Sequence, residues 1–412
     1  MTNKSELNAL VEHYHNGRNI FLNGPAGTGK TSCIKKFVAM LDLDERVNYQ
    51  ILAPTGTAAC NIQGITIQSY FHIVPVSGSN ARMQIQRSLY QNDGLDLLFI
   101  DEISMVGDEL FEVVDRILKK NYNSRKPFGG IQCIVCGDFY QLPPVKQKMC
   151  FEHKTWQRMN FVTIDFESQK RYTCERTFAT LGRIRVGRLS QPDRKWLAER
   201  KRAYAKKEHK LLPIKPVQLY SNRDDVAAIN SSKLAKVDQP LIKFAAIDEI
   251  NVPRNITLCT DKFLDELADP ECELKVSIPI IFYRNYNIGE TLTNGRSGIV
   301  AEINEEAKEV LVRLADGSEH LIVPKKYTTN GPGWSLSRTQ FPIRAGWAMT
   351  IAKAQGSTLD YAIVDLNCPY AGQAYTAISR VTSIDNLFIK NINYKTIKAD
   401  PNVNTYMNSL GW

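Results

Sequence analysis

Short apolar runs recur along the first 165 residues, and each run ends in a polar or glycine-rich stretch. The runs are NIFLN at 19–23, YQILA at 49–53, LDLLFIDE at 95–102 and IQCIVCGDF at 131–139. Between these runs, apolar residues recur at helical spacing over about 30–41 and 107–120. Strands that alternate with helices in this way predict an α/β fold with a mostly parallel sheet and helices on both faces.

The second half of the chain carries two different patterns. An α/β pattern begins with VQLYSNRDDVAAINSSKL at 217–234 and resumes with DYAIVDL at 360–366. Between them, short alternating strands with turns near 304–308 and 315–318 predict a small antiparallel barrel or meander. The domains expected from these patterns are a first domain over 1–165, a connector over 166–215, a second domain over 216–293 and 341–412, and a β module over 294–340 inserted in the second.

The connector contains a basic stretch, DRKWLAERKRAYAKKEHKLLPIK at 193–215, which predicts a long helix or linker. A solvated face or a hinge is the favoured interpretation of this stretch, and contact with nucleic acid is the alternative. The whole chain has a formal net charge of +9, which favours a polyanionic partner only mildly.

Cysteine usage and the length of apolar runs indicate the cellular setting. The nine cysteines are scattered singly except for Cys133 and Cys136. Residues three apart on a strand point to opposite faces, so we expect both thiols in the core of a protein from a reducing compartment. No apolar run approaches the ~20 residues of a membrane span, and the first residues lack a signal-peptide core. The expectation is an intracellular, soluble protein with no membrane partner.

The stretch GPAGTGKT, between the first apolar run and the first helix, fits the phosphate-binding pattern G-x-x-x-x-G-K-[ST] completely. Its glycines let backbone N–H groups turn toward phosphates, while Lys30 reaches the β and γ phosphates and the Thr31 hydroxyl binds Mg²⁺. The residues expected to hold the nucleotide are Gly24, Pro25, Ala26, Gly27, Thr28, Gly29, Lys30 and Thr31.

Further polar signatures follow apolar runs, at the edge where parallel sheets bind ligands. We expect Asp101 to hold Mg²⁺ and Glu102 to orient and deprotonate the attacking water. Gln141 lies just beyond another run, where a side-chain amide can sense the γ-phosphate or water. Phosphoryl transfer also needs cationic charge, for which Arg171 and Arg380 are candidates, although either alone would suit a surface ion pair.

Signals for nucleic-acid contact are diffuse. Thr55 and Thr57 follow a strand, and GITIQSYF at 64–71 offers hydroxyl groups and two aromatic rings. Such residues would suit phosphate contacts and base stacking on a single strand. From the residues alone, core packing is the favoured interpretation of Tyr70 and Phe71.

The order and content of these motifs resemble the petite-frequency branch of the superfamily 1B helicases, which are 5′→3′ DNA helicases related to RecD-like enzymes. The motifs that carry the resemblance are NGRNIFLNGPAGTGKT, APTGTAA, GITIQSYF, FIDEISM, GDFYQLPPV, TNGRSGIV, WAMTIAKAQGSTLD and GQAYTAISR. The stretch ELFEVVDRILKKNYNSRKPFGGIQ at 109–132 is the one most specific to this branch.

The resemblance implies two RecA-like P-loop NTPase domains with ATP between them, a small wedge insertion at about 72–94 and an SH3-like barrel over 294–340. It assigns catalysis to Lys30, Glu102, Gln141, Arg171 and Arg380, and it places both arginines in the second domain. The metal residues are Thr31 and Asp101, and further ATP-binding residues are Gln355 and Gly356. The motifs that line single-stranded DNA contain Thr55, Gly56, Thr66, Ser69, Tyr70, Thr350 and Lys353.

The chain departs from the family pattern at four positions. Leu7 stands where the family usually has a glutamine that recognises adenine, and Gln68 replaces a histidine. Ala352 and Ala354 replace a histidine and a serine. These changes leave the hydrolytic residues untouched.

The sequence thus predicts a motor that uses ATP and Mg²⁺ to translocate 5′→3′ on single-stranded DNA and to unwind duplex in genome maintenance. Its expected partners are single-stranded DNA and junctions of single- and double-stranded DNA, bound by a monomer or a DNA-induced oligomer. Two alternatives stay open from the sequence: a nucleotide-gated DNA-binding or loading factor that does not unwind duplex, and a superfamily 1 RNA helicase.

Overall fold

The computed structural model describes residues 4–43, 46–71, 73, 94–172, 174–253, 260–286, 292–331 and 333–411. The chain divides into two compact units. The first unit comprises Met1–Tyr172 and Ala399–Trp412, and the second comprises Thr173–Lys398. The wedge insertion expected at about 72–94 lies outside the described residues, apart from residues 73 and 94.

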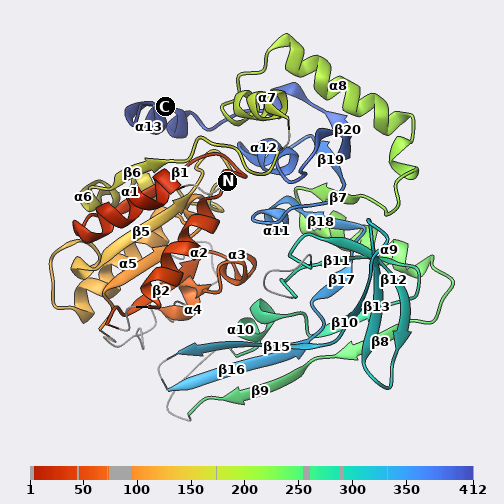
Figure 1. Cartoon of the computed structure of the whole chain (residues 1–412), viewed down its shortest axis with the longest axis horizontal. Coiled ribbons are helices and arrows are strands. Elements are labelled where there is room, and N and C mark those ends of the chain that lie inside the picture. Colours follow the sequence, from red (N-terminus) through yellow and green to blue (C-terminus); the bar gives the residue numbers. More distant parts are fainter. Residues whose placement is uncertain are drawn as a thin grey trace. The chain divides into compact units, whose positions relative to one another are not determined.

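The first unit is built on a six-stranded sheet in which every strand pair is parallel (Figure 1). The strand order is β3-β2-β4-β5-β1-β6. The strands are β1 (Ile20–Asn23), β2 (Tyr49–Ala53), β3 (Ile65–Thr66), β4 (Leu97–Ile100), β5 (Gln132–Gly137) and β6 (Val162–Asp165). The expected parallel α/β fold is therefore confirmed for this part of the chain.

Helices cover both faces of this sheet. On one face, Leu22 of β1 packs in a cluster with Leu10 and Phe37. On the other face, the rings of Phe21 and Trp156 lie with their centroids 5.7 Å apart. The helices of this unit are α1 (Lys4–His15), α2 (Lys30–Leu41), α3 (Gly56–Asn61), α4 (Ile67–Tyr70), α5 (Asp108–Asn121), α6 (Lys154–Met159) and α13 (Pro401–Ser409), with 3₁₀ turns η1 (Ile103–Met105), η2 (Pro127–Gly130) and η3 (Cys150–Glu152).

The cysteine pair of β5 lies in the core, as the sequence predicted. Cys133 and Cys136 are both fully buried, and both thiols are free. Cys136 joins the cluster that contains Leu10 and Phe37, whereas Cys133 does not. Alternation along the strand therefore directs the two side chains to opposite faces of the sheet.

Helix α13 packs on the first unit, whereas the sequence grouped its residues with the second domain. The Tyr406 ring stacks on Phe151 with centroids 4.3 Å apart and ring planes at 6°. The Tyr406 hydroxyl also accepts a hydrogen bond of 2.9 Å from Trp156 Nε1. These aromatic contacts and the satisfied indole N–H explain why the end of the chain returns to the first unit.

The second unit contains a four-stranded parallel sheet of order β18-β7-β19-β20. Its strands are β7 (Val217–Tyr220), β18 (Ala348–Thr350), β19 (Ala362–Leu366) and β20 (Leu387–Ile392). The helices of this unit are α7 (Glu175–Arg185), α8 (Gln191–Ala205), α9 (Arg223–Ala235), α10 (Thr260–Leu267), α11 (Ile351–Ala354) and α12 (Gln373–Ile378), with 3₁₀ turns η4 (Glu208–Lys210), η5 (Ile384–Asn386) and η6 (Tyr394–Thr396). The α/β patterns predicted at 217–234 and 360–366 are thus confirmed.

Antiparallel strands make up the rest of the second unit. Strands β12 (Ser297–Asn304), β13 (Glu309–Leu314) and β14 (Glu319–Ile322) form the meander that the sequence predicted. Their sheet continues through β11 (Pro279–Phe282) and β17 (Ile343–Ala345), which lie on either side of residues 294–340 in the chain. The remaining strands are β9 (Ile247–Asn251), β15 (Lys325–Gly331) and β16 (Trp334–Gln340), which form a three-stranded sheet, and the pair β8 (Ile242–Ala245) and β10 (Glu271–Leu274).

Candidate functional site

Three neighbouring strands bring the predicted nucleotide residues to one edge of the first unit's sheet. Strand β5 lies between β4 and β1, and all three run in the same direction. Residues 24–31 follow β1, Asp101 follows β4, and Gln141 lies beyond β5. The carboxyl ends of parallel strands meet at one edge, so segments far apart in the chain become neighbours there.

The loop of residues 24–31 turns tightly between β1 and α2. Gly27 has a φ of +81°, in the left-handed region, and a Cβ atom there would lie 2.7 Å from the Cβ of Arg171. A Cβ atom on Gly24 would lie 2.6 Å from the carbonyl oxygen of Phe166. Glycine is therefore needed at both positions, for space and at Gly27 also for conformation. The loop ends at the N-terminus of α2, where free N–H groups and the helix dipole favour phosphate.

Lys30, the first residue of α2, is held beside the loop by two carbonyl groups. Its Nζ donates hydrogen bonds to the carbonyl oxygens of Gly24 at 2.7 Å and Pro25 at 2.9 Å. The Thr28 hydroxyl donates to the same Pro25 oxygen at 2.9 Å. The ammonium group is therefore buried against the backbone that would receive the phosphates.

Asp101 and Glu102 lie next to this loop. The Thr31 hydroxyl donates to Asp101 Oδ2 at 3.4 Å, and the Glu102 N–H donates to Asp101 Oδ1 at 2.9 Å. Glu102 has φ 51° and ψ 45°, a left-handed conformation that few residues other than glycine adopt. A strained residue between a core strand and a polar turn is a frequent mark of a functional site.

Burial shifts the ionisation of Asp101. Loss of hydration is the main cause that raises the pKa of Asp101 from 3.8 to about 6, and the charge of Glu102 adds to the rise. Hydrogen bonds from the Glu102 N–H and the Cys136 thiol, together with the Lys30 ammonium, act in the opposite direction. A buried carboxylate of this kind is stabilised by a bound cation, which suits a metal ligand.

The donor set near the loop fits Mg²⁺. Asp101 offers a carboxylate and Thr31 a hydroxyl, and Mg²⁺ at nucleotide sites takes one or two carboxylates together with phosphate oxygens and water. Within the described ranges, no group of three or more histidine, cysteine, aspartate or glutamate side chains could hold a metal ion by itself. Thr31 and Asp101 would therefore share Mg²⁺ with the phosphates instead of enclosing it.

Gln141 follows β5 through a turn that Asp138 shapes. The Asp138 carboxylate accepts a hydrogen bond from the Tyr140 N–H at 3.1 Å, and the Asp138 carbonyl accepts one from the Gln141 N–H at 2.9 Å. Asp138 is fully buried, and Gln141 is 5% exposed. The aspartate thus forms the turn, and the turn leaves Gln141 at the edge that carries Lys30 and Asp101.

Arg171 belongs to the first unit, so its expected origin in the second domain is wrong. It follows β6, which pairs with β1, and the N–H of the preceding Lys170 donates to the Gly27 carbonyl at 2.9 Å. The pairing of β6 with β1 is the physical reason that Arg171 lies against the glycine-rich loop.

Arg380 and Gln355 lie in the second unit, and both are buried. Arg380 is 2% exposed, and its Nε donates to the Thr376 carbonyl at 2.8 Å. Its Nη2 donates to Ser379 Oγ at 2.7 Å. Gln355 is 4% exposed and precedes Gly356, which has a φ of +78°. Contacts with α12 therefore fix the Arg380 guanidinium inside its own unit.

The residues expected to contact DNA include two matching helix caps. Thr66 ends β3, and its hydroxyl accepts a hydrogen bond from the Ser69 N–H at 3.2 Å. Thr350 ends β18, and its hydroxyl accepts one from the Lys353 N–H at 3.1 Å. Both strands are edge strands of parallel sheets, so the two units carry the same capped turn at the same kind of position.

Tyr70 packs in the core, in agreement with the interpretation from the residues alone. Its ring centroid lies 4.8 Å from that of Phe71, and Tyr70 is 8% exposed. This burial leaves little ring surface for stacking on a base, which weighs against Tyr70 as a DNA contact. Thr55 and Gly56 stand at the start of α3, where the Thr55 hydroxyl accepts from the Ala58 N–H at 3.2 Å.

Two polar contacts at the nucleotide edge were not anticipated from the sequence. Cys136 of β5 hydrogen-bonds to Asp101, which continues the neighbouring strand β4. Asn23 Nδ2 donates to Asp165 Oδ1 at 2.9 Å and so ties the end of β1 to the end of β6. The sequence signal that could have indicated these two contacts was the polar residue at the end of each apolar run. Leu7, at the position expected to read adenine, packs on the core cluster around α1.

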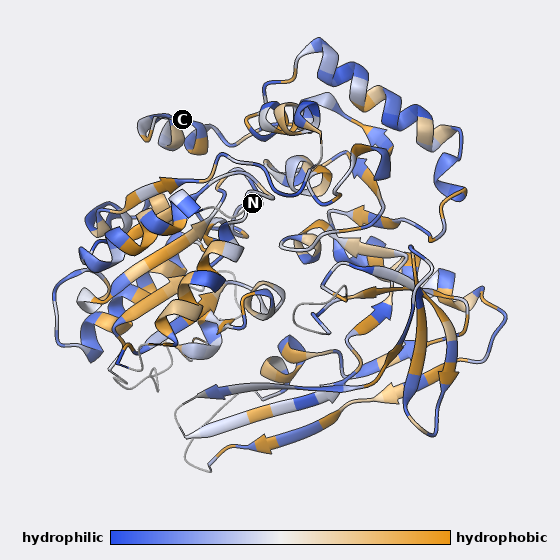
Figure 2. Cartoon of the chain, viewed as in Figure 1, coloured by the Kyte–Doolittle hydropathy of each residue, from blue (hydrophilic) through white to orange (hydrophobic). Residues whose placement is uncertain are grey.

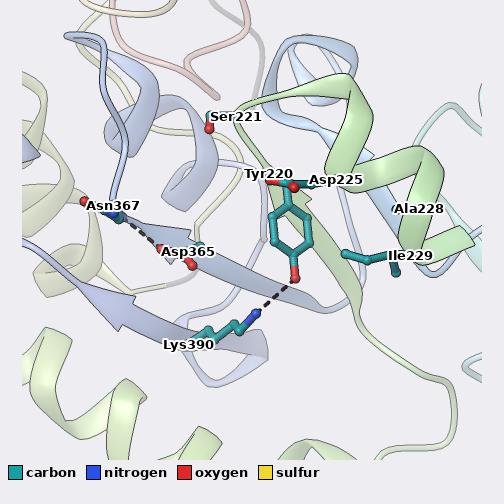
Figure 3. A pocket seen from close by; sticks show the side chains of 8 residues that line it. All are labelled: Tyr220, Ser221, Asp225, Ala228, Ile229, Asp365, Asn367 and Lys390. Carbon is teal, nitrogen blue, oxygen red and sulfur yellow. Dashed lines mark hydrogen bonds between the residues drawn. The ribbon is translucent and has the colours of Figure 1, made fainter.

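The second unit contains a separate cavity of about 500 Å³ near the carboxyl ends of β7, β19 and β20 (Figure 3). In this cavity, Lys390 points toward Tyr220, and its Nζ donates to the Tyr220 hydroxyl at 3.3 Å. The cavity is lined by Tyr220, Ser221, Asp225, Ala228, Ile229, Asp365, Asn367 and Lys390. These residues include none of the predicted site residues, so the cavity is distinct from the nucleotide edge.

The raised pKa of Asp101 predicts a pH-dependent effect of Asp101→Asn on stability. A carboxyl with a raised folded-state pKa stabilises the fold below its unfolded pKa, and this stability is lost as pH rises through about 6. Without Mg²⁺ or nucleotide, we expect Asp101→Asn to raise the free energy of unfolding by about 2–3 kcal/mol at pH 8, with a gain that shrinks toward pH 4. Urea unfolding across this range measures it.

The matched control is Glu12→Gln, which removes an exposed carboxylate from α1 of the same unit. Its effect on the free energy of unfolding should stay near zero at every pH. A gain for Asp101→Asn that did not change with pH would contradict the proposed burial of its charge.

No helix in the described parts of the chain has both the length and the apolar content that a membrane crossing requires.

Comparison with known proteins gives a consistent result over both units. The family model of the PIF1-like helicases matches residues 3–182. The human ATP-dependent DNA helicase PIF1 is 31% identical over 415 residues, an alignment that covers 97% of this chain and 62% of that protein.

Solved structures of helicases share the fold. Pif1 helicase from Candida albicans has 27% sequence identity and a TM-score of 0.77, with 100% of both chains covered. Pif1 from Bacteroides sp. in complex with ADP-AlF4 has 24% identity and a TM-score of 0.82, with 100% of this chain and 97% of that chain covered.

The chain spans 62–63% of the length of the vertebrate PIF1 proteins from Xenopus laevis, human and Danio rerio. The similarity extends over nearly all of this chain, and it includes the phosphate-binding loop and the Asp-Glu pair. Residues 3–182 match the model of the PIF1-like helicases and PIF1 relatives align along 97% of the chain, so the chain is similar to this family over both units.

Proposed function

We propose that this chain is a DNA-dependent ATPase and a 5′→3′ DNA helicase. The observation that carries the proposal is the convergence of Lys30, Asp101 and Gln141 at the edge formed by β1, β4 and β5. Those are the three kinds of group that ATP hydrolysis needs: a cation for phosphate, a carboxylate for metal and a polar sensor. Relatives that align along 97% of this chain carry the name ATP-dependent DNA helicase, which supports the proposed substrate class.

In the proposed hydrolytic step, the loop N–H groups and Lys30 bind the phosphates and stabilise their charge. Mg²⁺ held by Thr31 and Asp101 would add positive charge at the β and γ phosphates. Glu102 would accept a proton from the attacking water, and the Gln141 amide would orient that water.

Arginine charge completes the proposed site. Arg171 would reach the γ-phosphate from beside the glycine-rich loop of its own unit, because the backbone of Lys170 is already bonded to Gly27. Arg380 would contribute from the second unit, where α12 holds its guanidinium. Positive charge near the transferred phosphoryl group stabilises its transition state, so both arginines would act on the rate of hydrolysis more than on binding.

Single-stranded DNA is the proposed track. The capped turns at Thr66 and Thr350 would each present hydroxyl and backbone N–H groups to phosphates, one in each unit. The remaining proposed contacts are Thr55, Gly56, Ser69 and Lys353. Two RecA-like units that grip one strand alternately as ATP is bound and hydrolysed would step along it. The antiparallel strands around 294–340 would form the SH3-like barrel of the second unit.

We expect Glu102→Gln to lower the rate of ATP hydrolysis by about 10²–10⁴-fold, because the amide cannot accept the proton of the attacking water. Binding of ATP and of single-stranded DNA should persist, since Glu102 is assigned to neither. Single-turnover hydrolysis and nucleotide binding by fluorescence separate the two effects. The matched control, Glu12→Gln, should hydrolyse ATP at the parental rate. Parental turnover by Glu102→Gln would remove this residue from the site.

The direct test of the proposed function is unwinding of a duplex with either a 5′ or a 3′ single-stranded overhang. We expect single-stranded DNA to stimulate ATP hydrolysis more than RNA does, and only the 5′-overhang substrate to be unwound. ATP hydrolysis without unwinding of either substrate would favour a nucleotide-gated loading factor. Stimulation by RNA alone would favour an RNA helicase, and both outcomes would contradict the proposal.

A further inference from the structure

Helix α8, Gln191–Ala205, presents a basic face that the proposed hydrolytic and strand-gripping roles do not use. The helix carries five cationic side chains, Arg194, Lys195, Arg200, Lys201 and Arg202, and two acidic ones, Asp193 and Glu199. Lys206 and Lys207 follow directly in the chain. Figure 2 shows α8 as a mostly hydrophilic helix of the second unit.

The pattern of burial assigns these charges to faces of the helix. Asp193 and Leu197 are 1% and 0% exposed and lie on the face that packs toward β20. Arg194 and Lys201 are exposed and seven residues apart, and so are Lys195 and Arg202. Seven residues make nearly two turns, so the two members of each pair lie about 10 Å apart along the axis, and the two pairs form adjacent rows on the exposed side of the helix.

The acidic residues of α8 do not neutralise this face. The Asp193 carboxylate accepts from Arg183 Nε at 2.8 Å and from Arg183 Nη2 at 2.7 Å, on the buried side of the helix. The Arg183 and Ser190 hydrogen bonds hold the pKa of Asp193 well below its usual range. Glu199 is half-buried and lies four residues after Lys195 and three before Arg202, beside them on the helix surface. Arg200 pairs with Asp385 at 3.2 Å. The four exposed cations therefore outnumber the one half-buried carboxylate beside them, and the face keeps a positive charge.

The face belongs to a capped helix and lacks exposed aromatic rings on which bases could stack. The Ser190 hydroxyl caps the helix by accepting from the Asp193 N–H at 3.3 Å, and the Arg194 guanidinium lies 4.9 Å from the centre of the Tyr394 ring. The aromatic residues of α8 are turned away, since Trp196 and Tyr204 are half-buried and Tyr204 stacks on His209. Single-strand sites combine cations with exposed aromatic rings, so this face suits phosphate contacts better than base stacking.

We propose that the α8 face, defined by Arg194, Lys195, Lys201 and Arg202, binds the phosphate backbone of double-stranded DNA. Duplex DNA carries one negative charge per about 1.7 Å of its axis, so a 10 Å stretch presents about six charges to the two rows of cations. The exposed surface of a straight helix is convex, so it can contact a stiff duplex along its length. It cannot enclose a flexible single strand. The inference rests on the proposed function in taking DNA as the polyanion, and it adds a contact for the duplex arm of a junction.

The test is binding of a blunt-ended duplex, without nucleotide, over a range of NaCl concentrations. The test variant combines Arg194→Gln, Lys195→Gln, Lys201→Gln and Arg202→Gln. Each lost phosphate contact removes about 0.9 from the slope of log affinity against log salt, so we expect the slope to fall by about three to four. ATP hydrolysis at saturating single-stranded DNA should equal that of the parent, because no residue of the nucleotide edge is changed.

The charge-matched control combines Arg116→Gln, Lys120→Gln, Lys233→Gln and Lys236→Gln, which are exposed positions on α5 and just within or after α9. This control should keep the parental slope. An equal fall of the slope in both variants, or in neither, would overturn the assignment. An equal loss of affinity for oligo(dT) would overturn the choice of duplex. If the proposed helicase function were wrong, single-stranded DNA would fail to stimulate ATP hydrolysis by the parent protein. The duplex-binding assay does not depend on hydrolysis, so it tests the α8 face separately.

Discussion

The parallel pairing of β4, β5 and β1 is the constraint on which the nucleotide edge depends. Each of these strands is short and fully or almost fully buried, and each ends in a residue or loop with a chemical role. The side-chain direction along a strand alternates, so a shift of one residue in the β4–β5 register would turn Asp101 away from Thr31. The core packing that fixes this register also fixes the positions of Lys30 and Gln141.

The same packing lowers the stability of the fold when no metal ion is bound at the nucleotide edge. Asp101 is buried at the end of β4, which raises the pKa of Asp101 to about 6. Nearby groups moderate this effect, because Lys30, the Cys136 thiol and the Glu102 N–H favour the charged carboxylate. Binding of a metal ion and phosphate to this site would therefore raise the free energy of unfolding. Functional sites commonly lower the stability of the unliganded protein in this way.

The sequence predicted the local parts of this structure well, since the signals for them are local. Apolar runs gave the strands that end at Asn23 and Ile100, and the spacing of GPAGTGKT gave the loop and the start of α2. Contacts between distant segments were not predictable in this way. The family resemblance placed Arg171 in the second domain, and only the pairing of β6 with β1 shows that it lies against Gly27. Tyr406 returns to the first unit through its fit on Phe151, for which the sequence carries no periodic signal.

The antiparallel part shows the same division between local and distant contacts. The turns of the β12–β14 meander were visible as short polar stretches between alternating strands. The pairing of β9 with β16 joins residues such as Ile250 and Leu336, which are far apart in the chain. Local patterns could therefore indicate a β module but could not set its limits.

The most direct test of the nucleotide edge is a crystal structure of the chain with ADP, Mg²⁺ and a metal fluoride that mimics the transferred phosphoryl group. The predicted result has the fluoride group within hydrogen-bonding distance of Lys30 Nζ and the Gln141 amide, with the metal ion on Thr31 and beside Asp101. A nucleotide bound elsewhere, for example in the cavity between Tyr220 and Lys390, would contradict the account.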